Sequence, residues 1–530
     1  MLDHILQSAL GAISLSKLLA AILSAAGLSY VIYQVWFHPL AAYPGPFLAK
    51  LTDLYSVLHA VRGDRHEDLY RLHQRHGRIV RIGPNRVTIL DARALEPIYG
   101  HQANVQKSQW YHSFYSVSIF NAIDRNVHAR KRRVMSQAFS DQALRGMEPH
   151  ILTAIREWCL ALGDQHSSQT QKSSSSSGWS RPKDMVHMSA CLIFDALGEI
   201  CFGKTFDTTI SDENTFFFRM MALNVRILNI CGQMPWLRRI GFDQYLRMGT
   251  AADRERQIAF SRQQLTARLA ATPSTARRDI IYYLQQARDP ETGEGYSTQE
   301  LISESTLLLG AGAETANTAL AATWYFLAHH PAVRARLTDR VRAHFPTLEA
   351  IVAGPGLAAG QMGYLRACIE ESMRLCPPVP MDLPREVLPG GLRVLEWHFP
   401  AGTIVGVPTY ALHHSPAHFD RPFVYDPSRW VLRGSETADS DAEGVSPAVM
   451  ARQRAAFAPF SIGPRACIGR NVAMLELEVS VARVLWLYDL RLTPGMEHLG
   501  VGHEGEYKMK DNFIVGKEGP ILEFRRREGA

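Results

Sequence analysis

Cysteines are scarce in this 530-residue chain, and the seven that occur never form a Cys-x-x-Cys pair. Because cysteine zinc sites are built from such closely spaced pairs, the spacing excludes a structural zinc site of that kind. An odd, scattered set also argues against a disulfide framework and favours a reducing compartment. The net charge of +6 is mild, and basic residues do not alternate with aromatics along one face. We therefore expect no nucleic-acid partner.

Internal repeats and linkers are missing as well. Hydrophobic residues make up 46% of the chain and charged residues 20%, a balance that predicts a large buried core. No stretch rich in Pro, Gly and Ser is followed by a fresh periodic block. The sequence therefore predicts one large domain over residues 51–530.

One long segment, from Leu18 to Trp36, carries no charge. About twenty such residues span a bilayer, and its terminal aromatic residues suit the lipid headgroup region. Since the run is too long and wrongly flanked for a cleaved signal peptide, residues 1–37 are predicted to be an uncleaved membrane anchor. Basic residues follow it, whereas Asp3 offsets Lys17 before it, so the body is expected in the cytoplasm. Residues 38–50, with Tyr43-Pro44-Gly45-Pro46, predict a stiff hinge.

Helical periodicity dominates the body. Alternating apolar residues on either side of Gly83-Pro84-Asn85-Arg86 predict a β-hairpin between residues 78 and 90. Short extended stretches around residue 394, at 404–407 and at 513–515 are expected to complete a small sheet. The predicted fold class is therefore mainly α with a small β lobe. The predicted helices cover residues 129–158, 185–201, 215–230, 251–270 and 298–328.

The most informative motif is the loop Phe460-Ser-Ile-Gly-Pro-Arg-Ala-Cys-Ile-Gly469. Its glycines allow a tight turn, so that backbone N–H groups can point at the sulfur of Cys467 and stabilise a thiolate. A helix predicted over residues 472–487 would place this sulfur at a helix N-terminus, where negative charge is favoured. The loop indicates a haem ligand, and the alternative is a buried structural thiol.

Two further motifs place polar or charged side chains within predicted helices. Gly310-Ala311-Gly312-Ala313-Glu314-Thr315 places two glycines in mid-helix, each at a cost of about 1 kcal/mol relative to alanine. Thr315 can bond back to the carbonyl of residue 311 and open a groove, and Glu314 beside it can relay protons; plain helix packing is the alternative. Glu371 and Arg374 form either a surface pair or, with Arg429, a buried triad.

Together these motifs resemble, in order and spacing, the cytochrome P-450 family over the whole chain. The anchor, the hinge and the basic C-terminal tail are similar to fungal microsomal members of secondary metabolism. The resemblance implies the cytochrome P-450 fold and the cofactor haem b (iron protoporphyrin IX). It implies that Cys467 is the metal-binding axial thiolate and that Phe460 shields its sulfur. The residues similar to the propionate partners of the haem are His128, Arg132, Arg385 and Arg465.

The same resemblance implies a monooxygenase that inserts one oxygen atom from O2 into a lipophilic small molecule by hydroxylation or epoxidation. Glu314 and Thr315 resemble the catalytic acid–alcohol pair, and Ala316 follows where many relatives carry a second hydroxyl. Electrons are expected from NADPH through a separate NADPH–cytochrome P-450 reductase, which Lys131 and Arg133 are predicted to help dock. The expected location is the endoplasmic reticulum membrane, with a single span and a cytoplasmic catalytic domain.

Other activities stay open at this point. One is a small aromatic acid hydroxylase similar to benzoate 4-monooxygenase, and another is a haem-thiolate isomerase or dehydratase that does not use O2. A haem-binding electron carrier or gas sensor is a third. Asp382 is interpreted either as an anchor for a polar substrate group or as a hydrogen-bonded loop residue. The segments expected to line an apolar substrate pocket are 106–123, 307–315, 379–383 and 509–513.

Overall fold

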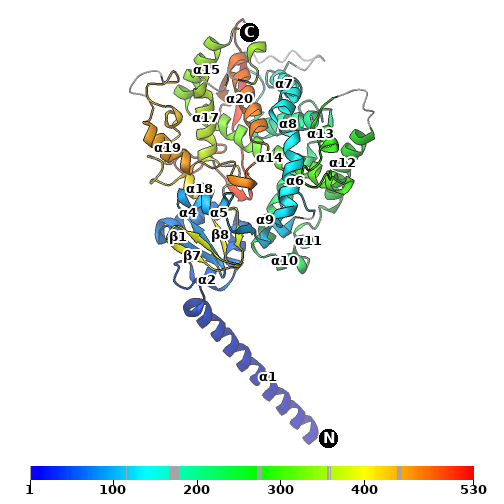
Figure 1. The fold of residues 1–530 in the computed structure, drawn as a ribbon, viewed down its shortest axis with the longest axis vertical. Helices are drawn as coiled ribbons and strands as arrows, with labels where there is room; N and C mark the ends of the chain where they lie inside the picture. Colours follow the sequence, from blue (N-terminus) through cyan, green and yellow to red (C-terminus); the bar gives the residue numbers. More distant parts are fainter. Residues whose placement is uncertain are drawn as a thin grey trace.

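The computed structural model describes residues 2–114, 116–165, 178–270, 277–354, 357, 360–438 and 444–529, with side chains from residue 15 onwards except at Gln361. A single long helix, α1, leaves a body in which a small β lobe lies beside this helix and the other helices fill the rest (Figure 1). The predicted mainly α fold with a small β lobe is confirmed.

The helices of the body fall into a longer group and a shorter group. The longer ones are α3 (Leu54–Arg62), α4 (Arg65–His76), α6 (Arg125–Ala138), α7 (Asp141–Leu162), α8 (Met185–Leu197), α9 (Phe216–Gln233), α12 (Ala251–Ala270), α13 (Ile280–Gln286), α14 (Thr298–His329), α15 (Pro331–His344), α17 (Gly363–Leu375), α19 (Pro447–Ala456) and α20 (Arg470–Leu487). The shorter ones are α2 (Phe47–Leu51), α5 (Leu95–Tyr99), α10 (Trp236–Arg239), α11 (Phe242–Leu246) and α18 (Thr409–His413). The predicted helix over 129–158 is in fact two helices, because Ser140 caps the start of α7.

The core is built around α14. A capping box of Ser297 and Glu300 fixes its first turn, and from Ala316 to Ala328 every side chain is buried. A helix that is buried on all sides must be surrounded by other elements. α14 indeed contacts α8, α9, α12, α15, α17 and α20. Because the start of this buried segment directly follows Glu314 and Thr315, the core holds the backbone of these two residues in place.

The strands within the described residues form four separate sheets. The predicted hairpin at 78–90 is confirmed as β1 (Ile79–Gly83) paired antiparallel with β2 (Arg86–Ile89). This hairpin belongs to a five-stranded sheet with the order β1-β2-β8-β5-β3, which also contains β3 (Val105–Lys107), β5 (Arg385–Val387) and β8 (Ile404–Gly406). The other sheets are β6 (Leu392–Val394) with β7 (Trp397–Phe399), β10 (Lys510–Asn512) with β11 (Ile514–Gly516), and β4 (Lys183–Asp184) with β12 (Ile521–Arg526) and β9 (Tyr488–Leu492).

The prediction that the stretches around 394, 404–407 and 513–515 complete one sheet is wrong. The strands near residues 394 and 514 each pair with an adjacent strand across a tight turn, β6 with β7 and β11 with β10. Only β8 joins the large sheet, between β2 and β5. A short strand can satisfy its backbone groups with its nearest neighbour in the chain, so short extended stretches do not reveal which sheet they join.

The N-terminal helix α1 (Leu2–Ile32) continues into a single wider turn over Tyr33–Phe37. Two described segments are long and apolar enough to cross a membrane, Leu15–Phe37 and Met185–Phe202. The second is 83% buried and belongs to the core, whereas the first is only 6% buried and stands outside the body (Figure 1). This apolar helix is compatible with a single membrane anchor.

The predicted hinge is docked on the β lobe. The backbone N–H of Arg81 donates to the carbonyl of Pro44 over 2.7 Å, and a side chain at Gly45 would collide with the carbonyl of Arg81. The Arg81 guanidinium reaches back and donates to the backbone and side-chain oxygens of Gln34 over 2.8 and 2.6 Å. These contacts tie the turn that follows α1 to β1.

Candidate functional site

The cysteine loop lies between α19 and α20. Its turn requires a left-handed residue at Gly463, with φ of +69°, and a side chain there would collide with the backbone oxygen of Tyr99. The Cys467 N–H donates to the Phe460 carbonyl over 2.9 Å and closes the loop. Gly469 is the N-cap of α20, so the loop delivers the Cys467 sulfur to a helix start, as predicted from the sequence. Cys467 is the one exposed side chain among the described cysteines.

Several groups lower the proton affinity of this thiol, although the protein around the sulfur works against them. The Cys467 side chain reaches solvent, but the protein atoms packed around its sulfur exclude water and raise its pKa, and the Gly469 N–H together with Arg132 and Arg470 offsets part of that effect. Arg132 also donates to the carbonyl of Ala466, next to the cysteine, over 2.7 Å. The Arg470 guanidinium lies 5.7 Å from the ring centre of Phe460. Phe460 is partly buried against the core, so an aromatic side chain and two cations flank the loop.

The four predicted propionate partners come together from distant parts of the chain. Arg465 donates to the carbonyls of Ala122 and Ile123. Burial and the neighbouring Arg385 lower the pKa of Arg465 to about 10. Burial, followed by the charges of Arg465, Lys107, Arg132 and Arg385, lowers the pKa of His128 to about 3, so this imidazole is neutral at pH 7.

Lys107 is a fifth member of this group that the sequence did not reveal. Its ammonium lies 4.1 Å from the ring centres of both Tyr111 and Phe120 and donates to the Phe120 carbonyl. Burial and then Arg385 and Arg465 lower its pKa well below the usual range. Among the described residues, no carboxylate forms an ion pair with any member of this cationic cluster of Lys107, His128, Arg132, Arg385 and Arg465. A lone lysine without a surrounding motif gives no signal in the sequence.

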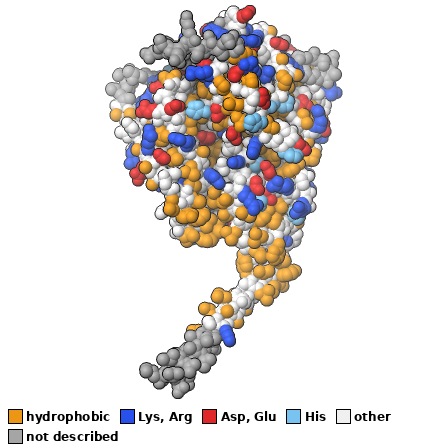
Figure 2. Space-filling view, turned by 180° about the vertical axis from the view of Figure 1, so that it is seen from behind, with side chains coloured by type: hydrophobic (Ala, Val, Ile, Leu, Met, Phe, Trp, Pro, Cys, Tyr) orange, Lys and Arg blue, Asp and Glu red, His pale blue; other side chains and the backbone are white. Residues whose placement is uncertain are grey.

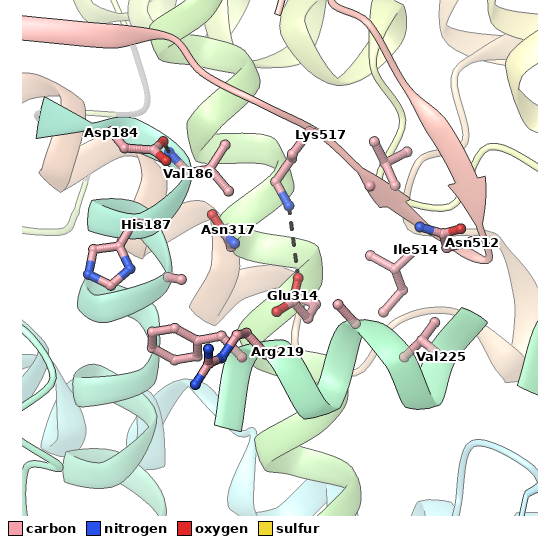
Figure 3. A pocket seen from close by; sticks show the side chains of 15 residues that line it. Asp184, Val186, His187, Arg219, Val225, Glu314, Asn317, Asn512, Ile514 and Lys517 are labelled. Carbon is pink, nitrogen blue, oxygen red and sulfur yellow. Dashed lines mark hydrogen bonds and ion pairs between the residues drawn. The ribbon is translucent and has the colours of Figure 1, made fainter. Parts of the chain in front are cut away.

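The acid–alcohol pair lies in the middle of α14. The Thr315 hydroxyl donates to the Ala311 carbonyl over 2.7 Å, which is the backbone bond predicted from the sequence. Ala311 is exposed, whereas Gly310 and Ala313 on either side of it are buried, so α14 presents an open face here. The Glu314 side chain points to a different neighbour, Lys517, whose ammonium nitrogen lies 3.9 Å from a carboxylate oxygen (Figure 3).

Three of the four segments predicted to line the pocket meet in one apolar cluster. Its buried members are Trp110, Tyr111, Val225, Met381, Phe513 and Ile514. Aromatic rings from 106–123 and Phe513 contact one another with centres 5.0–5.9 Å apart. α14 approaches the same cluster, because a side chain at Gly310 would touch the terminal methyl of Met221 at 2.7 Å. Met221 and Val225, both on α9, were not predicted. Tyr115, within the first segment, lies outside the described residues.

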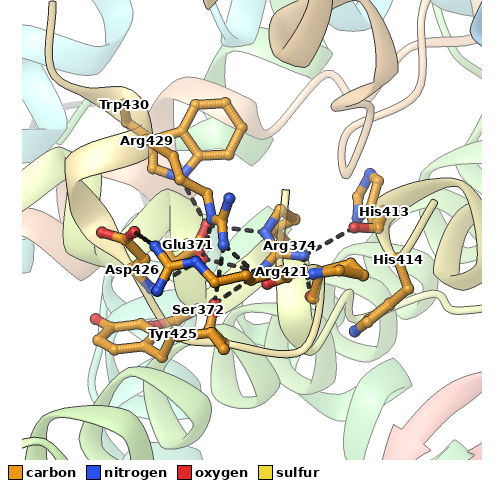
Figure 4. Close-up of polar contacts among 12 residues, drawn as sticks. Glu371, Ser372, Arg374, His413, His414, Arg421, Tyr425, Asp426, Arg429 and Trp430 are labelled. Atoms are coloured by element: carbon orange, nitrogen blue, oxygen red, sulfur yellow. Dashed lines mark hydrogen bonds and ion pairs between the residues drawn. The ribbon is translucent and has the colours of Figure 1, made fainter. Parts of the chain in front are cut away.

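The buried triad predicted around Glu371 is present (Figure 4). Both Glu371 oxygens accept from Arg374 at 2.9 Å, and one also accepts from Arg429 at 3.2 Å. Trp430 and the backbone N–H of Asp426 complete the set at 3.0 and 3.1 Å. Glu371 and Arg374 are fully buried. The surface-pair alternative is therefore excluded.

Lys131 and Arg133, which were predicted to help to dock a reductase, both form ion pairs within the protein. Lys131 is only 2% exposed and pairs with Glu300 and Glu304 of α14. The prediction that it helps to dock a reductase is therefore wrong, because one face of α6 packs inward. Arg133 is committed to Asp289.

Asp382 is fully buried and pairs with Arg65 at 2.8 Å. Burial raises the pKa of Asp382, but Arg65 and Arg86 outweigh this effect and hold it below its usual value. Asp382 is thus a structural ion-pair member with no charge left to anchor a substrate. The described residues also contain no cluster of three or more His, Cys, Asp or Glu side chains that could hold a metal ion.

Comparison with known proteins gives a consistent result. The sequence model of the cytochrome P-450 family matches residues 43–503. The cytochrome P-450 monooxygenase poxM of Penicillium oxalicum is 36% identical over 499 residues, covering 94% of this chain and 92% of that protein. The cytochrome P-450 monooxygenase atnE of Emericella nidulans is 34% identical over 501 residues, covering 94% of both chains.

The crystal structure of the cytochrome P-450DA haem domain superimposes with a TM-score of 0.69 at 18% identity, over 92% of this chain and 97% of that one. At this identity the match shows the fold alone. The family match and the two monooxygenases agree with it along nearly the whole length. The chain therefore belongs to the cytochrome P-450 family, whose cofactor is haem, and is an oxidoreductase of the monooxygenase type.

Proposed function

We propose that the protein is a haem-thiolate monooxygenase that inserts one oxygen atom from O2 into a lipophilic small molecule, by hydroxylation or epoxidation. The observation that carries the proposal is that the Cys467 loop and the cationic cluster lie together, since Arg465 belongs to the loop and Arg132 bonds to Ala466 in it. The similarity of the chain to monooxygenases of fungi supports a role in fungal secondary metabolite biosynthesis. The retained Glu314 and Thr315 favour this reaction over an isomerase or dehydratase that does not use O2, since reduction of one atom of O2 to water consumes protons that an acid–alcohol pair can deliver.

The residues present fit haem b. Buried cations are costly unless an anion compensates them, and in the described part of the chain the cationic cluster has no carboxylate partner. The two propionates of haem would supply that anionic charge, with Arg132, Arg385 and Arg465 as charged donors. The neutral His128 imidazole would donate a hydrogen bond. Cys467 would hold the iron, and Phe460 would shield the sulfur from water.

When bound, a thiolate-ligated haem supplies the electron density that favours cleavage of the O–O bond of dioxygen. The protein positions the substrate, excludes water from it and supplies protons. The apolar cluster around Trp110 and Phe513 keeps bulk water from the reacting carbon. The Thr315 hydroxyl would donate a proton at the open face of α14. Glu314, its neighbour in sequence, would then resupply that proton. With Ala316 buried and without a hydroxyl, Thr315 carries this task alone at that turn.

The apolar cluster also supports a lipophilic substrate class. Its lining comes from aromatic and aliphatic side chains on the short helical turn Gln109–Ser113 after β3, on α9, on the loop before β5, and on the β10–β11 hairpin. Since the charge of Asp382 is used by Arg65, the segment 379–383 offers the substrate no free carboxylate. A medium-sized lipophilic molecule without a basic group fits this lining.

The proposed reaction is tested with the full chain and a fungal NADPH–cytochrome P-450 reductase in vesicles. Extracts of cells with and without the active protein provide the candidate substrates. A product heavier by one oxygen, labelled when ¹⁸O2 is supplied, is expected together with NADPH consumption. A product formed without O2 would instead establish an isomerase or dehydratase.

We further propose that residues 1–37 are the membrane anchor, that residues 38–50 are the hinge and that residues 51–530 are the catalytic domain, which faces the cytoplasm from the endoplasmic reticulum. Exposed apolar side chains gather on the part of the body next to the anchor (Figure 2). They come from α2 and α3 on one side and from α10 and α11 on the other, and α3 and α10 both contact α9. These side chains are Phe47, Leu48, Leu54, Leu58, Val61, Trp236, Ile240, Tyr245 and Met248.

This surface is expected to dip into the bilayer. Ile240 is 66% exposed, and a patch of this kind beside an anchor is typical of a membrane-contacting face. An environment-sensitive dye on Ile240→Cys in the full chain should shift its emission to the blue in bilayer nanodiscs and be quenched by lipid-borne quenchers. The same dye on Ala335→Cys, on α15 at the far end of the body from α1 (Figure 1), is the control and should report water. Identical emission at both positions would contradict the proposed orientation.

For the reductase, we propose a docking site on the outer side of the cysteine loop. A cavity of about 880 Å³ there is lined by Phe460 and Ser461 together with side chains of α7, α17 and α20. Arg366 and Arg454 at this cavity are paired with Glu478 and Glu370. Arg145 of α7 is exposed beside them. An acidic partner surface would be attracted to this arginine.

Arg145→Glu is therefore expected to slow reductase-driven reduction about tenfold at low salt, because charge reversal weakens encounter more than it alters the site. The effect should shrink as salt is raised. Stopped-flow formation of the carbon monoxide complex measures the rate, and chemical reduction by dithionite should be unaffected. Arg262→Glu, on the exposed side of α12, is the matched control. Equal reduction rates for both variants would exclude this docking site.

A further inference from the structure

Residues 116–123, before α6, form a loop without helix or strand that contributes Phe120 and Ile123 to the apolar cluster. Because the loop has no ladder of backbone hydrogen bonds, its position depends on side chains that bind it from outside. The Phe120 ring lies 5.3–5.9 Å, centre to centre, from three other aromatic rings, those of Tyr111, Phe114 and Phe513. Its placement therefore shapes the proposed substrate pocket.

Two cations hold the second half of this loop. The Lys107 ammonium donates to the Phe120 carbonyl. Arg465 of the cysteine loop donates to the carbonyls of Ala122 and Ile123. Both cations belong to the cationic cluster, so this half of the loop is attached to the groups that would hold the haem propionates. These bonds leave the first half of the loop to another partner.

Glu304 of α14 holds the first half of the loop. Its two carboxylate oxygens accept from the backbone N–H of Ile119 over 2.9 and 3.1 Å. One of these oxygens also accepts from Lys131 of α6 over 3.0 Å. Glu304 is 0% exposed and Ile119 is 7% exposed. Since a buried N–H needs an acceptor and water has no ready access here, the loop depends on this carboxylate.

Lys131 determines how strongly the carboxylate holds the loop. Burial raises the pKa of Glu304, and Lys131 and the Ile119 N–H offset part of that effect, so they favour the ionised form. An ionised carboxylate accepts stronger hydrogen bonds than a neutral acid. Glu300, about one turn earlier in α14, pairs with the same ammonium at 3.1 Å. Its other partners are Arg130 and the backbone N–H of Ser297, away from the loop.

We propose that Glu304 is a positioning residue that sets the place of the Phe120 ring in the substrate pocket through the N–H of Ile119, and thereby determines which apolar substrates the pocket prefers. The inference rests on the proposed monooxygenase function, because the ring acts on a substrate bound at the apolar cluster. Phe120 directly follows Ile119, so a displacement of the Ile119 backbone moves the ring with it. Lys131 contributes indirectly, since its ammonium orients the carboxylate.

The test uses the full haem-loaded chain and two azole probes, imidazole and 4-phenylimidazole. Each probe binds haem iron through a ring nitrogen, and the shift of the Soret band measures its dissociation constant. Only 4-phenylimidazole carries an apolar ring that can contact the aromatic side chains of the pocket. Glu304→Met keeps the length of the side chain but has no strong acceptor for the Ile119 N–H. In this variant the preference for 4-phenylimidazole over imidazole should fall about tenfold, the size of one lost aromatic contact.

Three further variants separate positioning from general stability. Glu304→Gln should keep most of the preference, because its amide oxygen can still accept from Ile119. Glu300→Gln is the matched control, since it removes a carboxylate from the same lysine and should leave the preference unchanged. Phe120→Leu should lose the preference by itself. Adding Glu304→Met to Phe120→Leu should then change it by less than about twofold, because the ring that Glu304 positions is gone.

A native preference in Glu304→Met would overturn the inference. A full effect of Glu304→Met in the Phe120→Leu background would also overturn it, because Glu304 would then be merely structural. If Glu304→Met yields no haem-loaded protein, amide-resolved hydrogen exchange of the native chain decides. The Ile119 N–H should exchange at least about tenfold more slowly than an unstructured amide, and equal rates would contradict the inference. Azole binding uses neither NADPH nor O2, so failure of the proposed function would appear separately, as a native protein with normal azole preference that consumes no O2.

Discussion

Replacing Cys467 by serine is expected to abolish both product formation and the strongly red-shifted Soret band of the reduced protein with carbon monoxide. A thiolate donates electron density to iron, and a serine hydroxyl stays protonated at neutral pH and cannot replace it. The Gly469 N–H and the Arg132 guanidinium, which favour the negative sulfur, would then face a neutral oxygen. Difference spectra of carbon monoxide against reduced protein measure the band, and mass spectrometry measures the product.

Cys231→Ser serves as the control, because Cys231 is buried on α9 and does not belong to the cysteine loop. It should keep the red-shifted band. Haem content is measured in parallel, since the cationic cluster is expected to bind the propionates even when the sulfur is lost. An unchanged band in Cys467→Ser, or a native protein without such a band, would refute the assignment of Cys467 and with it the proposed function.

Neutralising Glu371 is expected to cause the largest loss of stability of any single substitution considered. Glu371→Gln removes the carboxylate that pairs with both Arg374 and Arg429 in a buried site. Breaking a buried ion pair in this way costs about 3–5 kcal/mol, because an uncompensated charge remains inside the protein. Urea unfolding of the full chain in detergent, followed by fluorescence, should show a correspondingly lower midpoint, together with a low yield of haem-loaded protein.

The matched control is Glu67→Gln on α4. Glu67 pairs with Arg71 at 3.2 Å, but both side chains are about half exposed, at 49% and 59%. Exposed pairs contribute about 0–1 kcal/mol, so the urea midpoint should barely move. Equal effects of the two substitutions would show that the Glu371 cluster does not stabilise the fold through buried charge.

The parts of the site that the sequence predicted are those in which the chemistry is local. A cysteine loop, a back-bonded threonine and a glutamate–arginine pair at i, i+3 each lie within a few residues of one another, so spacing alone indicates geometry. The helix predicted over residues 298–328 followed from its helical pattern and agrees with α14, Thr298–His329. Spatial partners of the triad were also predictable, because Arg429 belongs to a second motif.

The parts that the sequence could not predict depend on single residues brought together by the fold. Lys107 at the end of β3 and Lys517 just after β11 each meet the site from a distant part of the chain and belong to no motif. Arg130-Lys131-Arg132-Arg133 looks solvated as a run of four charges, but successive residues on a helix point in different directions. Lys131 consequently faces Glu304, whereas Arg132 turns to the cysteine loop. Whether a charged side chain of this run is buried depends on the residue that it contacts, and each of these contacted residues is far away in the chain.

The contact between Arg81 and Gln34 bears on how the protein is prepared for crystallisation. Shortened versions of membrane-anchored enzymes are commonly cut where the apolar segment ends. A chain that starts after residue 37 would lose both oxygens of Gln34 that accept from the Arg81 guanidinium, a group that is otherwise fully enclosed. A cut placed just before Gln34, with the preceding apolar turns removed, would retain that cap and leave β1 intact.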